Sequence, residues 1–394
     1  MLLRHRRIFA LITFVVLAAP LLVGLVAPDS PATVLREGRP VAPTPRLPTT
    51  ARSLLALSAS VDAYLKDHFG LRQLLMTAHR QLSEPMLGFG NDLVLVGRGG
   101  RMFFLGEDMV RQSSGLLVRA QGVADATDML VRMNDELHAR GIRFLVALPP
   151  NAATIYQDDL PLWAKNPGKP TEYDLLLANL AAKGVTAIDL RPALKNARTQ
   201  GPAFYMHDSH WTFRGALSAY DAIVEADAHA DWRIEPSAAL GPMTLRKGGD
   251  LARMLGTGDT VSEFAETLTL PYGKKLVQSS DAVGDFTATS EKTGPTILIL
   301  GDSFTSGFFP PMILQHAHRV VWMSHLVCGF DWNEVEKYRP DEVWWMPTER
   351  FLVCLTGKKP KGLPEGKADS AQGKVPAGLA AQMGGVRGRD GERE

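Results

Sequence analysis

The sequence predicts an α/β fold in which helices cover both faces of a mostly parallel sheet. Two segments with helical periodicity, residues 120–140 and 171–183, are each followed by a short apolar run, at residues 142–148 and 185–190. Helices that alternate with strands at this spacing are typical of parallel sheets. A third run, residues 297–300, contains only isoleucine and leucine, as expected of a strand that is buried on both faces.

Length and composition allow one large domain with extensions, or two domains. The chain has 394 residues, a formal net charge of +1 and 45% hydrophobic residues. Such a balanced charge gives no reason to expect a nucleic-acid partner. The two cysteines, Cys328 and Cys354, are too few for a disulfide scaffold or a cysteine-rich zinc site. We expect them either to pair in an oxidising compartment or to stay as buried free thiols.

The first 27 residues have the features of a membrane anchor. Three arginines and a histidine at positions 4–7 precede an uncharged run over residues 8–27. A helix of that length, rising about 1.5 Å per residue, crosses a hydrocarbon core of roughly 30 Å, and the arginines should stay cytoplasmic. A cleaved signal peptide is the alternative, but its apolar region is usually shorter. The sequence therefore predicts a single-pass protein of the bacterial inner membrane with its remaining chain in the periplasm.

The rest of the chain divides by composition. Residues 28–50 are rich in proline and are expected to form a stiff linker. Residues 357–394 are rich in Gly, Lys, Pro, Ala and charge, and are expected to be disordered. Residues 51–356, between the linker and the tail, are predicted to form the folded domain. Near its start, residues 92–96 and 102–105 flank a glycine-rich turn, which is typical of a β-hairpin.

A candidate nucleophile follows the apolar run of residues 297–300. Gly301 permits a positive φ or a close backbone approach, and Asp302 and Ser303 come next. Because open α/β sheets bind ligands at the carboxyl ends of their strands, Ser303 is expected at such a site. Free backbone N–H groups there would suit an oxyanion. An ordinary turn at a strand end is the alternative interpretation.

A candidate base lies upstream of this serine. Asp208 and His210 are two positions apart, before a predicted helix that Thr212 is expected to cap, with Trp211 packed in front of it. In an extended segment, residues two apart project to the same side, so both side chains should enter one cleft and His207 should face away. An imidazole oriented by a carboxylate can take the proton from a serine. A capped helix start with incidental Asp and His is the alternative.

Together, the two clusters resemble the SGNH (GDSL-like) hydrolase superfamily. The resemblance is carried by Gly301-Asp302-Ser303 and by Asp208-Ser209-His210-Trp211. The Asp-His pair precedes the serine here, whereas in that superfamily it usually follows. This inversion resembles the circularly permuted, AlgJ/AlgX-like branch of alginate O-acetyltransferases. The resemblance covers roughly residues 35–355 and includes Glu349-Arg350-Phe351-Leu352 near its end.

The resemblance implies a flavodoxin-like, three-layer α/β/α domain of the SGNH type with a mostly parallel sheet. It implies Ser303 as nucleophile, His210 as general base and then acid, and Asp208 as the orienting carboxylate, without a cofactor or a metal. An acetyl-serine would form and pass its acetyl group to a sugar hydroxyl. The backbone N–H of Ser303 is the first expected oxyanion donor, and Asp302 is expected to be structural.

The resemblance and the predicted anchor together imply a periplasmic O-acetyltransferase that acts on an exopolysaccharide, alginate-like or other. A polysaccharide acetyl-esterase or deacetylase with the same three residues is one alternative, and a non-catalytic scaffold of a polysaccharide export complex is another. Because the periplasm lacks acetyl-CoA, a multi-spanning membrane acyltransferase is the expected acetyl donor. Anchoring through residues 8–27 would hold the domain close to that partner.

Three further features are candidates for the site. Asn151 follows a predicted strand at a position where relatives tend to carry a lysine, and capping of a loop is favoured over a role in the cleft. Arg350 is expected either to reach the cleft or to form an ion pair near Glu349. Core packing is favoured over a sugar-binding platform for four tryptophans: Trp322, Trp332, Trp344 and Trp345.

Overall fold

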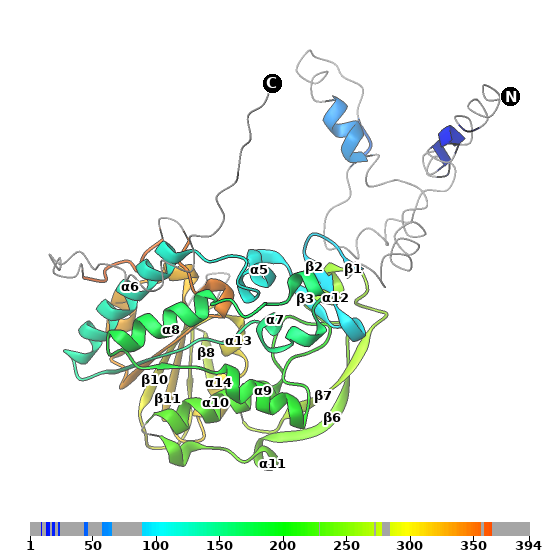
Figure 1. Ribbon diagram of the computed structural model, residues 1–394. Coiled ribbons are helices and arrows are strands. Elements are labelled where there is room, and N and C mark those ends of the chain that lie inside the picture. The colour runs from blue at the N-terminus through cyan, green and yellow to red at the C-terminus, as the bar shows by residue number, and fades with distance from the viewer. Residues whose placement is uncertain are drawn as a thin grey trace, which may run out of the picture.

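The structure of the protein is a computed structural model (Figure 1). It describes residues 89–364, apart from 228, 272, 278–283 and 356–357, and before them residues 9, 13–15, 18–19, 23, 43–45 and 57–64. The predicted anchor, linker and C-terminal tail lie mostly outside the described residues. Within the part of the chain that is described, no helix has the length and apolar character needed to cross a membrane.

A seven-stranded sheet forms the centre of the domain, in the order β5-β4-β12-β10-β11-β9-β8. Five neighbouring strands run parallel: β5 (Ala187–Ile188), β4 (Arg143–Ala147), β12 (Glu342–Met346), β10 (Thr296–Gly301) and β11 (Arg319–Ser324). Two antiparallel strands extend one edge: β9 (Phe286–Thr289) and β8 (Lys274–Val277). The prediction of a mostly parallel sheet is confirmed.

Helices cover both faces of this sheet, and alternate residues of β10 belong to two separate cores. Ile297 and Ile299 pack with one core, whose helices are α9 (Arg191–Gln200), α10 (Phe213–Ala226) and α14 (Phe309–Ile313). Leu298 and Leu300 pack with the other core, whose helices are α6 (Ala120–His138), α8 (Glu172–Ala182) and α15 (Trp332–Tyr338). Side chains of a strand alternate between its two faces, so the run of residues 297–300 is apolar because both faces are covered.

The elements expected in the first half of the domain are present with slightly different ends. Residues 120–140 contain α6, residues 142–148 contain β4, and residues 171–183 contain α8. The hairpin consists of β2 (Val94–Val96) and β3 (Met102–Phe104), which pair antiparallel, and β1 (Phe89–Gly90) adds a third strand. The strand expected over residues 185–190 is shorter, because β5 pairs with β4 only through Ala187 and Ile188.

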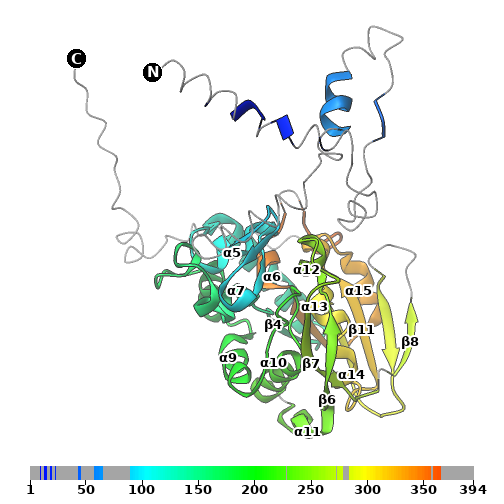
Figure 2. The same cartoon turned by 90° about the vertical axis from the view of Figure 1, so that its right-hand side faces the viewer.

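A two-stranded antiparallel ribbon outside the main sheet was not predicted. It consists of β6 (Leu240–Lys247) and β7 (Ser262–Leu268), with α12 (Asp250–Met254) between them. Figure 2 shows the ribbon running along one side of the domain next to α10. The carboxyl end of β6 and the start of α12 border the candidate site.

Short helices complete the described fold. The α-helices are α5 (Met109–Ser113), α7 (Ala152–Ile155), α11 (Pro236–Ala239) and α13 (Ser303–Ser306). The 3-10 helices are η1 (Arg98–Gly100), η2 (Gly106–Asp108), η3 (Gln157–Asp159), η4 (Leu162–Ala164), η5 (Ala230–Trp232), η6 (Leu326–Cys328) and η7 (Glu349–Phe351).

The tryptophans and cysteines in the C-terminal part of the domain have structural roles. Trp322, Trp332, Trp344 and Trp345 are all buried, so they form core and not a sugar-binding platform. Cys328 and Cys354 form a disulfide. Of the two states expected for the cysteines, the structure therefore shows pairing, and the bond joins the loop after β11 to the segment after β12.

Candidate active site

Ser303 lies at the carboxyl end of β10, as the first residue of α13. Asp302 caps this helix, because its Oδ1 accepts a hydrogen bond from the N–H of Phe304 at 2.9 Å. Gly301 does not adopt a positive φ. A Cβ at this position would lie 2.2 Å from Oγ1 of Thr305, so of the two roles expected for Gly301 the close approach applies.

The structure brings Ser303, His210 and Asp208 together. Nε2 of His210 lies 2.8 Å from Oγ of Ser303, and Nδ1 of His210 lies 2.7 Å from Oδ1 of Asp208. These distances are those of hydrogen bonds. The three side chains thus form one hydrogen-bonded chain that runs from a buried carboxylate to an exposed hydroxyl. His207 lies outside this chain, with its Nδ1 3.5 Å from Oε1 of Glu263.

The start of α10 is fixed against the turn that carries Ser303. The side chain of Thr212 accepts a hydrogen bond from the N–H of Gly215 at 3.2 Å, which is the expected cap. Trp211 is fully buried, and its Nε1 donates to the carbonyl of Phe304 at 2.9 Å. Its ring packs against that of Phe309. The helix cap and the tryptophan therefore set the position of the imidazole one residue earlier.

Asp208 accepts hydrogen bonds at both carboxylate oxygens. Beyond the imidazole, Oδ2 accepts from Nη2 of Arg246 at 2.7 Å and from the N–H of Asp250 at 3.2 Å. Burial alone would raise the pKa of Asp208, but the hydrogen bonds from His210 and Arg246 outweigh it and hold that pKa well below its ordinary value. The carboxylate is therefore ionised at neutral pH and can orient the imidazole and stabilise its protonated form.

Sequence reasoning missed Arg246 and Asp250. Arg246 lies in the unpredicted strand β6, and Asp250 begins α12. Oδ2 of Asp250 lies 3.6 Å from Nδ1 of His210. Gly249 lies between Arg246 and Asp250 in the sequence. A Cβ at Gly249 would lie 2.0 Å from the carbonyl oxygen of His207, so only glycine lets this loop approach the segment of Asp208. The pair Gly248-Gly249 before an acidic residue is the one sequence signal for this contact.

The carboxylates and imidazole of this site could also be considered as metal ligands. One donor atom each from Asp208, His210 and Asp250 lies within 4.8 Å of the others. The oxygens of Asp208, however, already accept from His210 and Arg246. The guanidinium already compensates the negative charge of Asp208, so the arrangement suits proton transfer at the imidazole better than metal binding.

The segment after β12 borders the site from the other side. Oδ2 of Asp302 accepts from both the N–H and the hydroxyl of Thr348, at 2.8 and 2.6 Å. Asp302 is thus engaged in holding two segments together, as expected of a structural residue. Arg350 follows shortly after and is buried, with its Cζ 5.2 Å from the ring centre of Phe304. It forms no ion pair with any of the described residues, so pairing near Glu349 is not its role.

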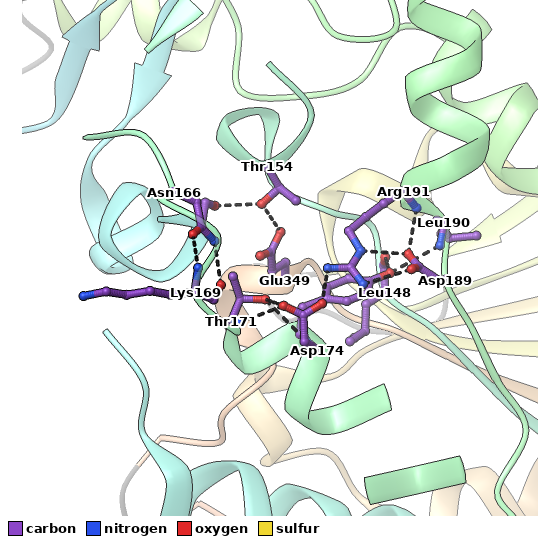
Figure 3. Close-up of polar contacts among 12 residues, drawn as sticks. Leu148, Thr154, Asn166, Lys169, Thr171, Asp174, Asp189, Leu190, Arg191 and Glu349 are labelled. Atoms are coloured by element: carbon purple, nitrogen blue, oxygen red, sulfur yellow. Dashed lines mark hydrogen bonds and ion pairs between the residues drawn. The ribbon is translucent and has the colours of Figure 1, made fainter. Parts of the chain in front are cut away.

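Asn151 and Glu349 belong to a buried polar network beside the site. The carboxylate of Glu349 accepts from the N–H of Asn151 at 2.7 Å. It also accepts from the hydroxyl of Thr154 at 2.7 Å (Figure 3). Nδ2 of Asn151 donates to Oγ of Ser113 at 3.1 Å. Burial raises the pKa of Glu349 to about 7. The side chain of Asn151 therefore contacts this network and not the Ser303 hydroxyl.

A second group of ionisable side chains lies at the opposite end of the sheet. Oε1 of Glu342 lies 2.5 Å from Nε2 of His229 and 2.9 Å from Nη1 of Arg143, which also pairs with Asp227. A cavity of about 550 Å³ opens beside Arg143 and Glu342. Because ligands of open α/β sheets bind at the carboxyl ends of the strands, we regard this group as an ion-pair network and not as the site.

The sequence of this domain matches one protein family. The family model described as SGNH hydrolase-like domain, acetyltransferase AlgX, matches residues 94–347. The chain belongs to this family. The matched region of the AlgX-type SGNH domain includes Asp208, His210 and Ser303.

Two curated relatives of this family member are probable alginate O-acetylases AlgJ. The one from Pseudomonas aeruginosa is 24% identical over 160 residues, which are 41% of this chain and 39% of the relative. The one from Pseudomonas syringae pv. tomato is 24% identical over 162 residues, which are 40% of this chain and 39% of the relative. The chain therefore matches about two fifths of the length of these relatives.

Solved structures with a similar fold include three proteins. The O-acetyltransferase domain of Pseudomonas putida AlgJ is 19% identical, with a TM-score of 0.41 over 66% of this chain and 92% of that one. Bacillus cereus PatB1 with a sulfonyl adduct is 14% identical, with a TM-score of 0.48 over 70% and 100%. Pseudomonas aeruginosa AlgX is 15% identical, with a TM-score of 0.43 over 66% and 63%. At these scores the structural likeness adds nothing to the family match.

Proposed function

We propose that the protein is an O-acetyltransferase that moves an acetyl group through Ser303 onto a hydroxyl of an exopolysaccharide. The observation that carries this proposal is the hydrogen-bonded chain of Asp208, His210 and Ser303 within a domain of an acetyltransferase family. Its polymer is an alginate-like or another polysaccharide, since the two AlgJ relatives are named probable alginate O-acetylases.

The first half-reaction forms an acetyl-serine. Nε2 of His210 takes the hydroxyl proton while Oγ of Ser303 bonds to the acetyl carbonyl carbon, and the carbonyl π pair moves to its oxygen. When the C=O bond forms again, the bond to the donor's oxygen breaks. The donor leaves with the proton that His210 returns. Asp208 keeps Nδ1–H directed at itself throughout, which leaves Nε2 free to accept from Ser303.

The second half-reaction repeats these steps with the sugar as nucleophile. A sugar hydroxyl gives its proton to Nε2 of His210 and bonds to the acetyl carbon. Collapse of the tetrahedral intermediate breaks the bond to Oγ of Ser303, which takes the proton back. Water in place of the sugar would give an esterase, so the acceptor that reaches the acetyl-serine decides between transfer and hydrolysis.

The proposed location is the periplasmic face of the bacterial inner membrane, with residues 8–27 as a single-pass anchor. The uncharged run in these residues supports an anchor, and the Cys328–Cys354 disulfide suits an oxidising compartment. A multi-spanning membrane acyltransferase is proposed as the acetyl donor. Sedimentation of the full chain with membranes checks this location, and its release into the soluble fraction after cell breakage would contradict the anchor.

The covalent step is tested by intact mass after incubation with an activated acetyl ester. The wild-type protein should gain one acetyl group, and Ser303→Ala should gain none. Ser306→Ala is the matched control, because Ser306 lies in the same short helix and should leave the adduct unchanged. A wild-type protein that forms no adduct would instead support the non-catalytic scaffold.

The transfer step needs a separate measurement on the acetylated protein. An oligosaccharide acceptor should speed the loss of the adduct and appear as an acetylated sugar in the mass spectrum. Loss of the adduct at the same rate with and without acceptor, and without an acetylated product, would overturn transfer in favour of an acetyl-esterase.

A further inference from the structure

The segment after β12 places a buried arginine at the sheet edge that carries Ser303. Strands β12 and β10 are adjacent and parallel, so the segments that follow them emerge at the same edge. The hydrogen bonds from Thr348 to Asp302 then tie one segment to the other, at the residue directly before Ser303. Arg350 lies two positions after this tie, so the tie holds its backbone near the turn of Ser303.

The guanidinium of Arg350 lacks the acceptors that a buried charge normally has. Only 9% of the residue is exposed, and its Nε and Nη1 are buried without a hydrogen-bond partner among the described residues. The nearest rings are those of Phe351 and Phe304, with centres 5.0 and 5.2 Å from Cζ. Burial lowers the pKa of Arg350, and the charges of Asp302 and Asp250 oppose that effect.

The nearby carboxylate of Asp302 does not serve as the missing partner. Its Oδ1 accepts from the N–H of Phe304, and its Oδ2 accepts twice from Thr348. A buried, unpaired guanidinium is costly to folding. An anionic oxygen that binds there during the reaction would supply the missing hydrogen-bond acceptor.

The guanidinium also shares a packing partner with the proposed base. The ring of Phe304 lies 4.9 Å from the ring of His210, centre to centre, and 5.2 Å from Cζ of Arg350. Phe304 directly follows Ser303 in the chain. The imidazole and the guanidinium therefore both lie around the turn that presents the Ser303 hydroxyl.

We propose that Arg350 donates hydrogen bonds to the oxyanion that forms when Ser303 attacks the acetyl carbonyl. This inference rests on the proposed function. The carbonyl oxygen gains the π electron pair, and the unpartnered N–H groups of the guanidinium stabilise it. No covalent bond to Arg350 forms and no proton leaves it, because a guanidinium stays protonated throughout. The backbone N–H of Ser303 is the expected second donor.

His325, at the carboxyl end of the neighbouring strand β11, has a buried Nδ1 that also lacks a partner among the described residues, but its ring can offer an oxyanion no positive charge. Its backbone N–H donates to the carbonyl of Gly301 at 3.0 Å, and its ring lies 5.5 Å from that of Phe351. Burial lowers the pKa of His325 to about 4, so this imidazole is neutral at pH 7. The positive charge beside the turn is then that of Arg350.

The test is the rate at which Ser303 is acetylated by an activated acetyl ester without any sugar acceptor. Arg350→Ala should slow this step about 10²- to 10³-fold, as removal of an oxyanion donor does in other acyl-transfer enzymes. Added guanidinium at concentrations that do not denature the protein should restore part of the rate in Arg350→Ala. Arg350→Lys should lie between, because it keeps the charge without the planar fork.

Arg319→Ala is the control, since Arg319 lies at the amino end of β11 and its Nε also lacks a hydrogen-bond partner among the described residues. It should leave the acetylation rate unchanged. An unchanged rate in Arg350→Ala while the wild type acetylates would overturn the proposal, and so would a loss seen only when acceptor is added. A slow variant that guanidinium does not rescue, with Arg350→Lys equally slow, would assign Arg350 a structural role. A wild-type protein that forms no adduct would contradict the proposed function itself.

Discussion

The carboxylate of Asp302 accepts hydrogen bonds from Thr348, whereas the imidazole of His210 bonds to the neighbouring residue, Ser303. One oxygen of Asp302 accepts both the N–H and the hydroxyl of Thr348, at 2.8 and 2.6 Å. The acidic residue directly before the proposed nucleophile therefore connects the carboxyl ends of β10 and β12. This contact, together with the hydrogen bonds of Glu349 and the Cys328–Cys354 disulfide, positions the segment that follows β12.

Thr348→Val should weaken this connection while keeping the shape of the buried side chain. Loss of a hydrogen bond to a charged acceptor costs about 1.5–3 kcal/mol, measured as a lower free energy of unfolding in urea. Acetylation of Ser303 should also slow, because Arg350 loses its fixed position. Thr199→Val is the control, since Thr199 is exposed in α9 and should change stability by less than about 0.5 kcal/mol. Equal losses in both variants would contradict the role of the contact.

Gly301→Ala should disrupt the turn, and Gly307→Ala should not. A Cβ at Gly301 would lie 2.2 Å from Oγ1 of Thr305, whereas nothing lies within 4 Å of a Cβ at Gly307. The hydroxyl of Thr305 cannot move freely, because it accepts from Nε1 of Trp322 at 2.9 Å. We expect a lower melting temperature and slower acetylation for Gly301→Ala alone, by thermal unfolding and intact mass. A Gly301→Ala protein as stable and as reactive as Gly307→Ala would refute this.

Glu349 should make the protein less stable as the pH rises from about 4.5 to about 7. Burial raises the pKa of this carboxyl from 4.5 to about 7, so in that window the folded protein binds a proton that the unfolded chain has lost. The stabilisation is complete below the unfolded pKa and is lost as the pH rises through the folded one. A shift of this size corresponds to roughly 3 kcal/mol.

Glu349→Gln should remove this part of the pH dependence. The amide oxygen can still accept from Asn151 and Thr154, but it does not titrate. Urea unfolding between pH 4.5 and 8 should therefore give a flatter stability curve for the variant than for the wild type. Parallel curves for the two proteins would show that Glu349 is ionised in the folded state.

Reduction of the Cys328–Cys354 disulfide should destabilise the domain. The two cysteines are 26 positions apart, and closing a loop of that size contributes about 3 kcal/mol on the chain-entropy model. The melting temperature of the wild type should fall when a reductant is added. The double variant Cys328→Ser/Cys354→Ser should melt at the lower temperature with or without reductant. An identical response of both proteins would mean that the thiols are not paired in solution.

Local patterns were sufficient to predict the parts of the site that lie next to regular elements. The apolar run of residues 297–300 identified β10, and the residues that followed it identified the turn of Ser303. Trp211 and Thr212 identified the start of α10, which placed His210 one residue before it. In each case the neighbours in sequence are also the neighbours that determine the conformation.

Arg246 and Asp250 could not be predicted in this way. Strand β6 is mostly exposed and lacks the alternation of apolar and polar residues that marks a half-buried strand. Met243 and Leu245 are exposed in this strand. The sequence pattern therefore indicates neither that a strand is present nor which of its faces is buried. The contact of Arg246 with Asp208 depends on how the ribbon packs, which no local pattern reports. The expectations for residues 8–27 fall mostly outside the described residues and stay predictions.

The position of β12 has a consequence for how the protein is made. Strand β12 lies between β4 and β10 in the sheet, although it is the last of the described strands in sequence order. During synthesis, β4 and β5 emerge early and β8 to β11 later, but the two groups cannot join until the strand that separates them leaves the ribosome. The nucleophile segment and the segment of Arg350 then dock in one late step. We expect nascent chains that end before β12 to keep two unpaired strand edges, and thus to depend on chaperones until the sheet closes.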